Sequence, residues 1–389
     1  MIARTRRPFR VLHVITRLER GGSSDCTLWQ AIGAARRGHE VTVASGPTAA
    51  PSPLLAIARR EARLAFVTLA SLGRPIRPWR DARALASIWT LVRRGRFDII
   101  HLHTSKAGAL GRLAAFAAGQ RRRVIHQPHG HLFYGYYGGG LSRLVVAAER
   151  ALAPLARLHL TLTDAGTGQH LERGIGRLEQ YRTLASGVDF RPLRAAARRR
   201  AECRSRHGFG PGEIVVGTLC RLEAVKGAGV LTAAFLEAAA DRPALRLVVG
   251  GDGPLRATLL DEVERAGAGA RVRLPGGWIP PADLLPACDI FVLASRNEGM
   301  GRALVEAMAL GVPVIASAVG GVPDLLDHGR AGLLVPPDDA AALAGAIARL
   351  ADDRPRAQAL GRAGRARAVA YGAGRMVHRL LGLYDQVAA

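Results

Sequence analysis

The sequence predicts an α/β protein of two doubly wound domains, each built on a parallel sheet with helices on both faces. Short β-branched runs alternate with longer Ala-, Leu- and Arg-rich segments of helical period, and continuous apolar strands separated by helices are typical of parallel sheets. The pattern starts again after residue 212, so the chain contains two such series. A length of 389 residues agrees with this, because it exceeds what one ordinary core can bury.

The expected strands are short apolar runs bounded by turn residues or by helical segments. In the first series they are Arg10–Ile15, Glu40–Ala44, Phe97–His101, Val124–His126 and Leu158–Leu162. In the second series they are Ile214–Leu219, Leu245–Val249, Arg271–Leu274, Ile290–Leu293 and Val314–Ala316. Ligands of open α/β sheets bind beyond the carboxyl ends of the strands. We therefore expect the two domains to face each other across a cleft, which is lined by the motifs that follow these strands.

The domain boundary is expected near Ala185–Gly187. The segment from Arg191 to Arg206 is so rich in Arg and Ala that we interpret it as an exposed helix or linker, and the turn residues of His207–Gly212 open the second domain. The predicted domains are residues 1–187 and 188–370. Apolar residues at helical spacing predict a helix within residues 371–389, which we expect to pack back toward the first domain.

The charge of the chain is strongly positive, with a formal net charge of +24. Most of the excess lies in residues 1–190, which contain 29 basic and 11 acidic residues. This asymmetry favours contact with a polyanionic partner such as an acidic membrane surface; the alternative is a solvated surface in an Arg-rich chain. Nucleic acid is not an expected partner, because only 5% of residues are aromatic and no basic–aromatic interleaving is present.

The four cysteines and the apolar runs bear on the compartment. The cysteines are scattered without a CxxC pair, which favours a reducing cytoplasm over a disulfide framework or a zinc site. The run Val11–Ile15 is too short for a secretory signal and is interpreted as a first core strand. No apolar run reaches the about 18 residues of a membrane-spanning helix. We expect a cytoplasmic protein whose membrane contact, if any, is peripheral on the inner face of the cell membrane.

The strongest motif of the second series is Ser295–Gly301, which leads into a helix. Glu298 ends the loop after a strand, and Glu306 lies roughly two turns along the following helix. Carboxylates at this position suit the hydroxyls of a sugar and of a ribose, because a buried acid needs a partner. Gly299 and Gly301 flank Met300 and bring backbone N–H groups to a helix N-terminus, where a diphosphate is stabilised.

Two further loops of the second series follow strands. Arg221 and Lys226 lie at a strand-to-helix turn, where two cations can clamp a diphosphate; the alternative is a solvated surface pair. The Gly250–Pro254 turn, with Gly251, fits the lining of a cleft and would equally serve a structural role.

The first series contributes a paired-glycine loop and a histidine-rich loop. Gly21 and Gly22 precede a helix and allow an anion to approach the backbone, or they form only a tight turn. His129 and His131 belong to the run His126–His131, which has no nearby Cys or acid to complete a metal site and no HExxH pattern. We therefore expect no metal and no cofactor, and expect a histidine here to contact the donor sugar.

Together these residues resemble the retaining GT-B glycosyltransferases of family 4. The resemblance is carried by the glutamates at 298 and 306, the following run Ala307–Ser317, Gly320–Asp324 and Gly332–Pro336, and also by Ser186–Asp189. It implies a GT-B fold and a nucleotide-sugar donor, used as a substrate without a metal. It implies that Arg221 and Lys226 bind the diphosphate, Glu306 the ribose, and Glu298 the transferred sugar. It also implies that His129 lies beside the reacting sugar and that Gly21 and Gly22 line the diphosphate and acceptor side. We expect a UDP-linked donor, although the sequence itself does not disclose the nucleotide. Cys220 and Ser186 depart from the family's usual Gly and Asn, which puts pocket and nucleobase fit in question.

A narrower resemblance is carried by His101–Gly108 and Pro128–Tyr137. These segments resemble bacterial enzymes that extend sugars on polyprenyl-diphosphate carriers, which implies an acceptor-side role for Lys106 and His131. The basic stretch Arg74–Arg96, with Trp79, Ile88 and Trp89, is then expected on the membrane interface, or else is an ordinary core-facing helix.

Three alternatives remain open at the level of sequence. The first is a soluble GT-B enzyme with a small-molecule acceptor, or a GT-B sugar epimerase, for which no acid/base residues are identifiable. The second is a nucleic-acid binder, suggested only by the pI. The third is a nicotinamide dehydrogenase, which is disfavoured because the glycine loops lack the GxGxxG spacing.

Overall fold

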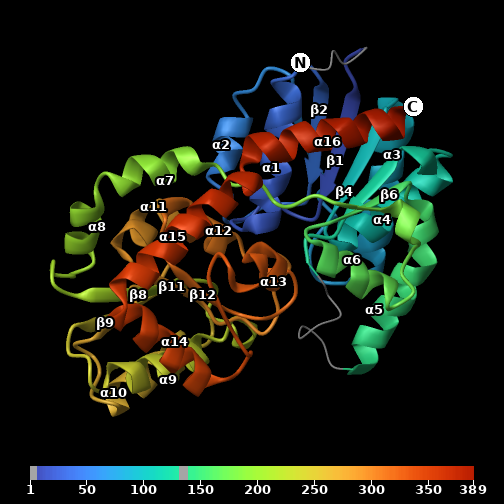
Figure 1. The fold of residues 1–389 in the computed structure, drawn as a ribbon. Coiled ribbons are helices and arrows are strands. Elements are labelled where there is room, and N and C mark those ends of the chain that lie inside the picture. The colour runs from blue at the N-terminus through green and yellow to red at the C-terminus, as the bar shows by residue number, and fades with distance from the viewer. Residues whose placement is uncertain (1–6, 131–138) are drawn as a thin grey trace. The chain divides into compact units, whose positions relative to one another are not determined.

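The computed structural model describes residues 7–130 and 139–389 and divides into two compact units (Figure 1). The first unit comprises Met1–Gly187 together with Ala373–Ala389, and the second comprises Val188–Gly372. The chain therefore leaves the first unit after Gly187 and returns to it for its last helix. Within the described residues, no helix is both long and apolar enough to cross a bilayer.

The first unit is built on a seven-stranded sheet in the order β3-β2-β1-β4-β5-β6-β7, and every neighbouring pair is parallel. All five expected strands are present, and the sheet gains a further strand at each edge, β3 and β7. The bounds are β1 (Arg10–Ile15), β2 (Glu40–Ser45), β3 (Leu64–Thr68), β4 (Ile99–His103), β5 (Val124–Gln127), β6 (Leu158–Thr161) and β7 (Tyr181–Thr183).

Helices cover this sheet, and the last helix of the chain is one of them. The bounds are α1 (Gly22–Ala35), α2 (Leu54–Ala58), α3 (Pro78–Gly95), α4 (Ser105–Ala117), α5 (Gly139–Leu152), α6 (Asp164–Leu171) and α16 (Ala373–Ala388), with 3-10 turns η1 (Arg121–Arg123), η2 (Ala153–Leu155) and η3 (Leu178–Gln180). Helix α16 lies beside α1 (Figure 1). A Cβ on Gly33 of α1 would lie 2.3 Å from a methyl carbon of Val377, so glycine permits this close approach. Residues of α16 are consequently part of the first unit's core.

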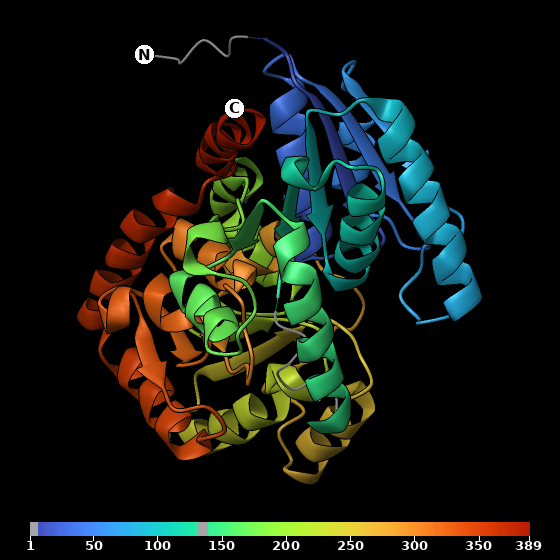
Figure 2. The same cartoon turned by 90° about the vertical axis from the view of Figure 1, so that its right-hand side faces the viewer.

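Helix α3 only partly meets the expectation of a membrane-interface helix. Ile88 is fully buried with Ala84 and Val92, and it packs in the core between α3 and the sheet. Trp89 is partly buried against the same core. Trp79, near the start of the helix, is 85% exposed. The body of α3 (Figure 2, light blue) is therefore a core-facing amphipathic helix, and its one exposed large apolar side chain is Trp79, near the N-terminal end.

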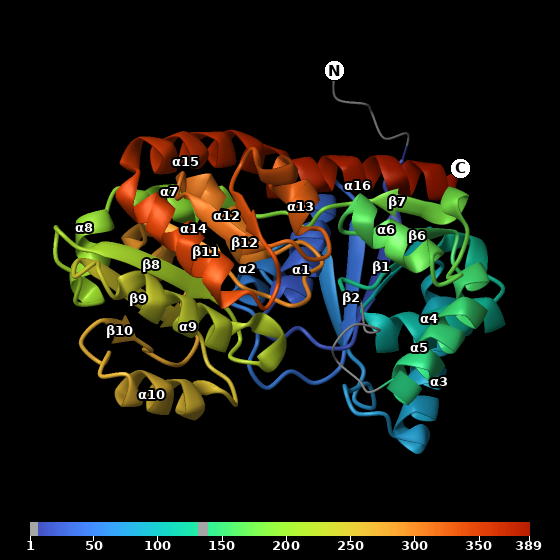
Figure 3. The same cartoon turned by 60° about the horizontal axis from the view of Figure 1, so that its bottom comes forward.

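The second unit is built on a six-stranded parallel sheet in the order β10-β9-β8-β11-β12-β13 (Figure 3). Its strands are β8 (Ile214–Leu219), β9 (Leu245–Gly250), β10 (Val272–Arg273), β11 (Ile290–Leu293), β12 (Val314–Ser317) and β13 (Leu333–Val335). The five expected strands of the second series are all present, and β13 is added at one edge.

The helices of the second unit cover both faces of its sheet. Their bounds are α7 (Phe190–Ala197), α8 (Arg200–Arg206), α9 (Ala228–Ala239), α10 (Arg256–Arg265), α11 (Pro281–Leu284), α12 (Arg302–Leu310), α13 (Val322–Leu325), α14 (Ala340–Asp352) and α15 (Arg354–Ala368), with 3-10 turns η4 (Ala224–Lys226), η5 (Leu285–Ala287), η6 (Asp327–Gly329) and η7 (Val369–Tyr371). Phe235 of α9 and Ile347 of α14 pack in one core with Val292 of β11. Successive strand residues point to opposite faces, and Phe291 is buried on the other one.

The segment expected to be an exposed helix or linker is helical and mostly exposed, but it is fixed to the second unit. It forms α7 and α8, and Arg204 is only 7% exposed. The Arg204 guanidinium donates to Asp289 at 2.8 Å and to the carbonyl oxygens of Gly210 and Glu213. A buried guanidinium needs such a set of acceptors, and sequence composition gave no indication of them.

Candidate active site

Both sheets have a point at which the order of the strands reverses, and the candidate residues lie there. In the second unit the reversal falls between β8 and β11, and in the first unit it falls between β1 and β4. Loops leave such a point in opposite directions and open a crevice outside the carboxyl ends of the strands. The loops that follow these four strands carry most of the residues singled out from the sequence.

The loops at this edge of the second unit are joined by backbone hydrogen bonds. The Cys220 N–H donates to the Gly250 carbonyl at 3.0 Å, and the Leu222 N–H donates to the Asp252 carbonyl at 2.8 Å, which joins the loops after β8 and β9. The Arg296 N–H donates to the Val225 carbonyl at 2.8 Å, which joins the loops after β8 and β11. The backbones of the three loops are therefore connected to one another.

Two glycines allow these loops to approach so closely. Gly227 has φ +66° and Gly251 has φ +126°, both in the region that disfavours residues with a side chain. A Cβ on Gly227 would lie 1.9 Å from the Ala294 carbonyl oxygen, and a Cβ on Gly251 would lie 1.9 Å from that of Cys220. Any larger residue at either position would push apart two of the loops. This is a structural requirement for Gly251 at least as much as a ligand-binding one.

An ion pair between Lys226 and Glu298 lies at the reversal point of the second sheet. The Lys226 ammonium is 2.5 Å from a Glu298 carboxylate oxygen, and the side chains are only 16% and 12% exposed. The Ser295 hydroxyl donates to the same carboxylate at 2.9 Å. The pair brings together one residue assigned to the diphosphate and one assigned to the sugar, so a cation and an acceptor of hydroxyl protons lie side by side.

Glu306 is buried in α12, as expected for a carboxylate that needs a partner. It is 7% exposed, and the Arg302 guanidinium approaches it at 3.4 Å from the preceding turn. The helix starts after Gly301, which has φ +74° and caps it. Met300 is 2% exposed and contributes an apolar side chain beneath the loop. Gly299, Met300 and Gly301 therefore bring the chain to the helix N-terminus, where the dipole favours an anion.

Arg221 is placed differently from Lys226, although both follow β8. Its side chain is 52% exposed and it forms an ion pair with Glu223. The two cations expected to form a clamp therefore differ in their surroundings. Lys226 is largely buried and paired with Glu298, whereas Arg221 is half exposed and paired with Glu223.

The reversal point of the first unit also carries a glycine loop. Gly21, with φ +150°, precedes α1, which starts at Gly22. A Cβ on Gly21 would meet no atom within 4 Å, so space lies beside this backbone. In the next loop the Thr104 hydroxyl is 2.7 Å from that of Thr16, which joins the loops after β1 and β4.

Two residues at this edge have left-handed backbones without being glycine. Thr104, with φ +62°, precedes α4, and His129, also with φ +62°, lies in the loop after β5. Such conformations cost on the order of 1 kcal/mol or more and are concentrated at functional sites. The Thr104 N–H donates to the Gln127 carbonyl at 3.1 Å, so the two strained segments are adjacent.

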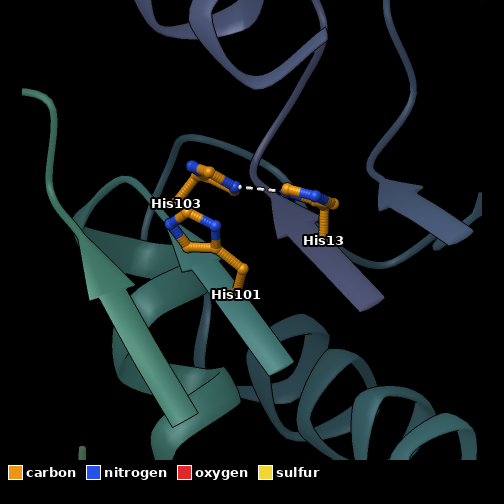
Figure 4. Close-up of side chains that lie close together, drawn as sticks. All are labelled: His13, His101 and His103. Atoms are coloured by element: carbon orange, nitrogen blue, oxygen red, sulfur yellow. Dashed lines mark hydrogen bonds between the residues drawn. The ribbon is translucent and has the colours of Figure 1, made fainter. Parts of the chain in front are cut away.

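His129 is the outermost member of a group of linked side chains. Its Nε2 is 2.9 Å from Nδ1 of His103, and Nε2 of His103 is 2.8 Å from Nδ1 of His13 (Figure 4). His13 lies opposite His101 in the register of β1 and β4. The Tyr384 hydroxyl of α16 is 3.0 Å from Nδ1 of His101 and 3.3 Å from Nε2 of His13. Four of these five side chains are fully buried.

Burial keeps the inner histidines uncharged. Loss of solvation, reinforced by neighbouring His129, lowers the pKa of His13 to about 3. Burial also holds the pKa of His101 and of His103 well below the usual range, and the neighbouring histidines add to this. Among the described residues, His13, His101 and His103 form a group whose ring nitrogens lie within 4.8 Å of one another, as metal ligands would.

Lys106 and His131 differ in what the structure says of them. The Lys106 ammonium is 2.5 Å from Asp81 and donates to the Pro75 carbonyl, so it is held at the start of α3. A phosphate would have to compete with these contacts for it. His131 lies outside the described residues.

Comparison with known proteins assigns the chain to a family. Residues 199–367 match the model of the glycosyl transferases group 1, and residues 21–187 match that of a glycosyl transferase 4-like domain. The GDP-mannose-dependent alpha-(1-6)-phosphatidylinositol monomannoside mannosyltransferase of Mycobacterium tuberculosis is 34% identical over 66% of this chain and 69% of its own length. This protein is a group 1 glycosyltransferase.

Other similar proteins differ in what they act on. A D-inositol 3-phosphate glycosyltransferase of Saccharomonospora viridis is 30% identical to this chain. The match covers 76% of this chain and 71% of the Saccharomonospora protein. Anabaena HepE, solved with UDP and glucose, superposes with a TM-score of 0.81 at 22% identity, covering 97% of this chain and 100% of that one. The expected GT-B fold of two Rossmann-like units is confirmed.

The residues that sequence reasoning did not assign are those behind His129. His101 and His103 alternate along one strand and so share a face, which was a usable sign that they lie together. The contributions of His13 and Tyr384 depend on strand register and on the return of α16, and neither was available from local sequence.

Proposed function

We propose that this glycosyltransferase moves a sugar from a nucleotide-diphosphate sugar, UDP-linked, to a hydroxyl of a glycan or polyprenyl-diphosphate-linked acceptor, with retention at the anomeric carbon. The observation that carries the proposal is the Lys226–Glu298 pair at the strand reversal of the second unit. A cation for a diphosphate and a carboxylate for sugar hydroxyls are there adjacent, beside a glycine-capped helix.

The donor is proposed to bind by exchanging partners within this group. Lys226 passes from Glu298 to the donor diphosphate, and exposed Arg221 moves in as a second cation. Glu298 is then left to accept hydrogen bonds from the transferred sugar. Glu306, held near Arg302, accepts from the ribose hydroxyls. A buried carboxylate that gains hydroxyl donors recovers part of its burial cost.

The transfer step needs little from the protein beyond placement and charge. The acceptor hydroxyl oxygen bonds to the anomeric carbon while the bond from that carbon to the diphosphate oxygen breaks. The hydroxyl proton goes to an oxygen of the leaving diphosphate on the same face, and this accounts for retention. Lys226, Arg221 and the N-terminus of α12 stabilise the departing charge. We propose that no metal takes part, with His129 contacting the reacting sugar.

The similar proteins differ in the nucleotide for which they are named or with which they were solved. The mycobacterial relative is named for GDP-mannose, whereas the Anabaena neighbour was solved with UDP. A thermal-shift panel of UDP-glucose, UDP-N-acetylglucosamine and GDP-mannose, read together with slow donor hydrolysis, separates them. Stabilisation by a UDP-sugar is expected; stabilisation by GDP-mannose alone would overturn the UDP assignment.

Variants of the panel test the site itself. Glu306→Gln is expected to weaken donor affinity about tenfold to a hundredfold, because two hydroxyl hydrogen bonds to a charged group are weakened. Glu264→Gln makes the same change on an exposed residue of α10 and should leave affinity unaltered. Equal donor affinity in the two variants would remove Glu306 from the ribose site. No response of the wild type to any nucleotide sugar would refute the donor proposal as a whole.

The acceptor proposal draws on exposed apolar side chains of the first unit. Ile76 and Trp79, at the start of α3, are 79% and 85% exposed, and Phe116 at the end of α4 is 52% exposed. They accompany the cationic excess of the N-terminal half, and such a combination suits an anionic membrane on whose cytoplasmic face a lipid-linked acceptor is presented. The alternative of a small phosphorylated acceptor is favoured by the inositol phosphate relative.

Sedimentation with vesicles containing anionic phosphatidylglycerol distinguishes the two acceptor classes. Binding that is lost in Ile76→Ser/Trp79→Ser, and kept in Trp278→Ser of the second unit, is the expected result. Trp278 is a matched control because it is 48% exposed. Absence of binding at low salt would favour the small-molecule acceptor.

A further inference from the structure

We propose that His103, His13, Tyr384 and His101 form a buried hydrogen-bonded relay that sets the tautomer of His129, and that they are positioning residues for sugar transfer. The inference rests on the proposed function, since it takes His129 as the residue beside the reacting sugar. None of the four is proposed to touch the substrate.

The relay is continuous from the site into the core. Its successive separations are 2.9 Å from His129 to His103, 2.8 Å to His13, 3.3 Å to the Tyr384 hydroxyl and 3.0 Å to His101. All but the longest lie in the normal range for a hydrogen bond. The four inner side chains are fully buried, so water cannot replace a missing link.

Each link constrains the next, because a neutral imidazole has one N–H and one acceptor nitrogen. His103 and His13 use both ring nitrogens within the relay, so each must donate on one side and accept on the other. The Tyr384 hydroxyl has a single proton for its two histidine neighbours. When the hydroxyl donates to one histidine and accepts from the other, the protons all point toward His129 or all point away from it.

The inner end of the relay selects the first of these directions. Nε2 of His101 and the amide nitrogen of Gln127 are both buried without a well-aligned partner. Gln127 lies within hydrogen-bonding reach of His101, where its oxygen would raise the pKa of that histidine, but this oxygen accepts from Gln30 at 2.9 Å and leaves the amide nitrogen as the available donor. An unprotonated Nε2 on His101 lets the Gln127 amide donate to it, which satisfies both atoms. His101 then carries its proton on Nδ1.

The consequence at the site is a defined tautomer. Donation passes from His101 to Tyr384, then to His13, to His103 and finally to Nε2 of His129. The proton of neutral His129 is thereby held on Nδ1, which presents a donor toward a substrate oxygen. The neutral state of the inner histidines agrees with this pattern, because burial lowers the pKa of each.

A metal ion is the competing explanation for three clustered histidines. Tetrahedral ligands at metal–nitrogen distances of about 2.0–2.1 Å are separated by about 3.3 Å. Nδ1 of His13 and Nε2 of His103 are instead 2.8 Å apart, which is the spacing of a hydrogen bond. Tyr384 also occupies the other nitrogens of His13 and His101.

The test removes one oxygen atom far from the substrate. Tyr384→Phe breaks the relay between His13 and His101, and Tyr181→Phe is the matched control. Tyr181 is likewise a buried tyrosine of the first unit, whose hydroxyl donates to the Ile175 carbonyl at 2.7 Å. For the nucleotide sugar that the wild type hydrolyses best, we expect kcat of Tyr384→Phe to fall about tenfold or more with KM unchanged. Tyr181→Phe should retain wild-type kcat after correction for folded fraction.

A second measurement does not depend on turnover. Long-range nitrogen–proton NMR of ring-labelled histidine should show His129, assigned by its Gln variant, as the Nδ1–H tautomer in the wild type. A mixture of tautomers is expected in Tyr384→Phe. The Nε2–H tautomer in the wild type, or equal kcat losses in both Phe variants, would overturn the relay. Stoichiometric metal that is lost in His13→Gln would also overturn it. A wild type that hydrolyses no donor refutes the proposed function, and the NMR result then still decides the relay.

Discussion

The buried ion pair of the second unit permits a double-substitution test. Lys226→Met removes the ammonium while keeping the length of the side chain, and it leaves the Glu298 carboxylate hydrogen-bonded to the Ser295 hydroxyl. Exposed pairs contribute up to about 1 kcal/mol, and breaking a fully buried one costs about 3–5 kcal/mol. With 16% and 12% of the two side chains exposed, we expect the free energy of unfolding to fall by about 2 kcal/mol.

Scanning calorimetry measures this loss in the full chain. The second unit comprises residues 188–372. In a domain of this size, a loss of 1 kcal/mol in the free energy of unfolding lowers Tm by about 2–4 °C. Lys226→Met should therefore lower the Tm of that unit by about 4–8 °C. Arg221→Met makes the same chemical change in the same loop, but on a side chain that is 52% exposed. Its Tm should change by less than about 2 °C.

Coupling between the two partners decides whether the pair itself is responsible. Glu298→Gln alone is expected to cost about 1 kcal/mol, because its amide oxygen still accepts a hydrogen bond. The double variant Lys226→Met/Glu298→Gln should cost less than the sum of the single changes by at least about 1 kcal/mol. Additive losses, or a Tm for Lys226→Met equal to that of Arg221→Met, would refute the reasoning.

Two further predictions concern stability. Gly227→Ala should lower Tm by several degrees more than Gly208→Ala. Both glycines have left-handed φ, but only at Gly227 would a Cβ clash with the backbone, 1.9 Å from the Ala294 carbonyl oxygen. Equal Tm shifts in the two variants would contradict this prediction. The free energy of unfolding should also fall as pH decreases from 6.5, because burial lowers the pKa of His13 and of His159 to about 3 while an unfolded histidine titrates near 6.5. The unfolded chain then binds more protons, and each group contributes a loss of about 2 kcal/mol between pH 7 and pH 5, measured by urea unfolding; a pH-independent midpoint over this range would argue against buried neutral histidines.

The sequence was sufficient for every interior strand and for the edge strand β10, but not for the other three edge strands. All ten expected strands are present, and the three that were not expected, β3, β7 and β13, each lie at the edge of a sheet. β7 and β13 have only three residues each, and in β3 only Leu64 is buried, so none of the three has the longer buried apolar run by which an interior strand is recognised. In β7, for example, only Tyr181 is buried.

The same distinction applies to the site. Lys226, Glu298 and Glu306 were identifiable because they stand in loops and helix turns that follow recognisable strands. The side chains that they contact could not be identified from the sequence. The Lys226–Glu298 contact, for example, joins residues 72 positions apart, which the reversal of strand order brings together. The relay behind His129 was even harder to predict, because Tyr384 lies more than 280 residues along the chain from His101.

The return of α16 to the first unit has a consequence for biosynthesis. A nascent chain is made from its N-terminus, so residues 7–187 emerge long before the helix that covers α1. Until residues 373–389 have been translated, the packing surface around Gly33 lacks Val377, and His101 lacks the Tyr384 hydroxyl. The second unit, Val188–Gly372, has no such dependence and can complete its core first. The core of the unit that is translated first can therefore be completed only after the unit that is translated second has been made.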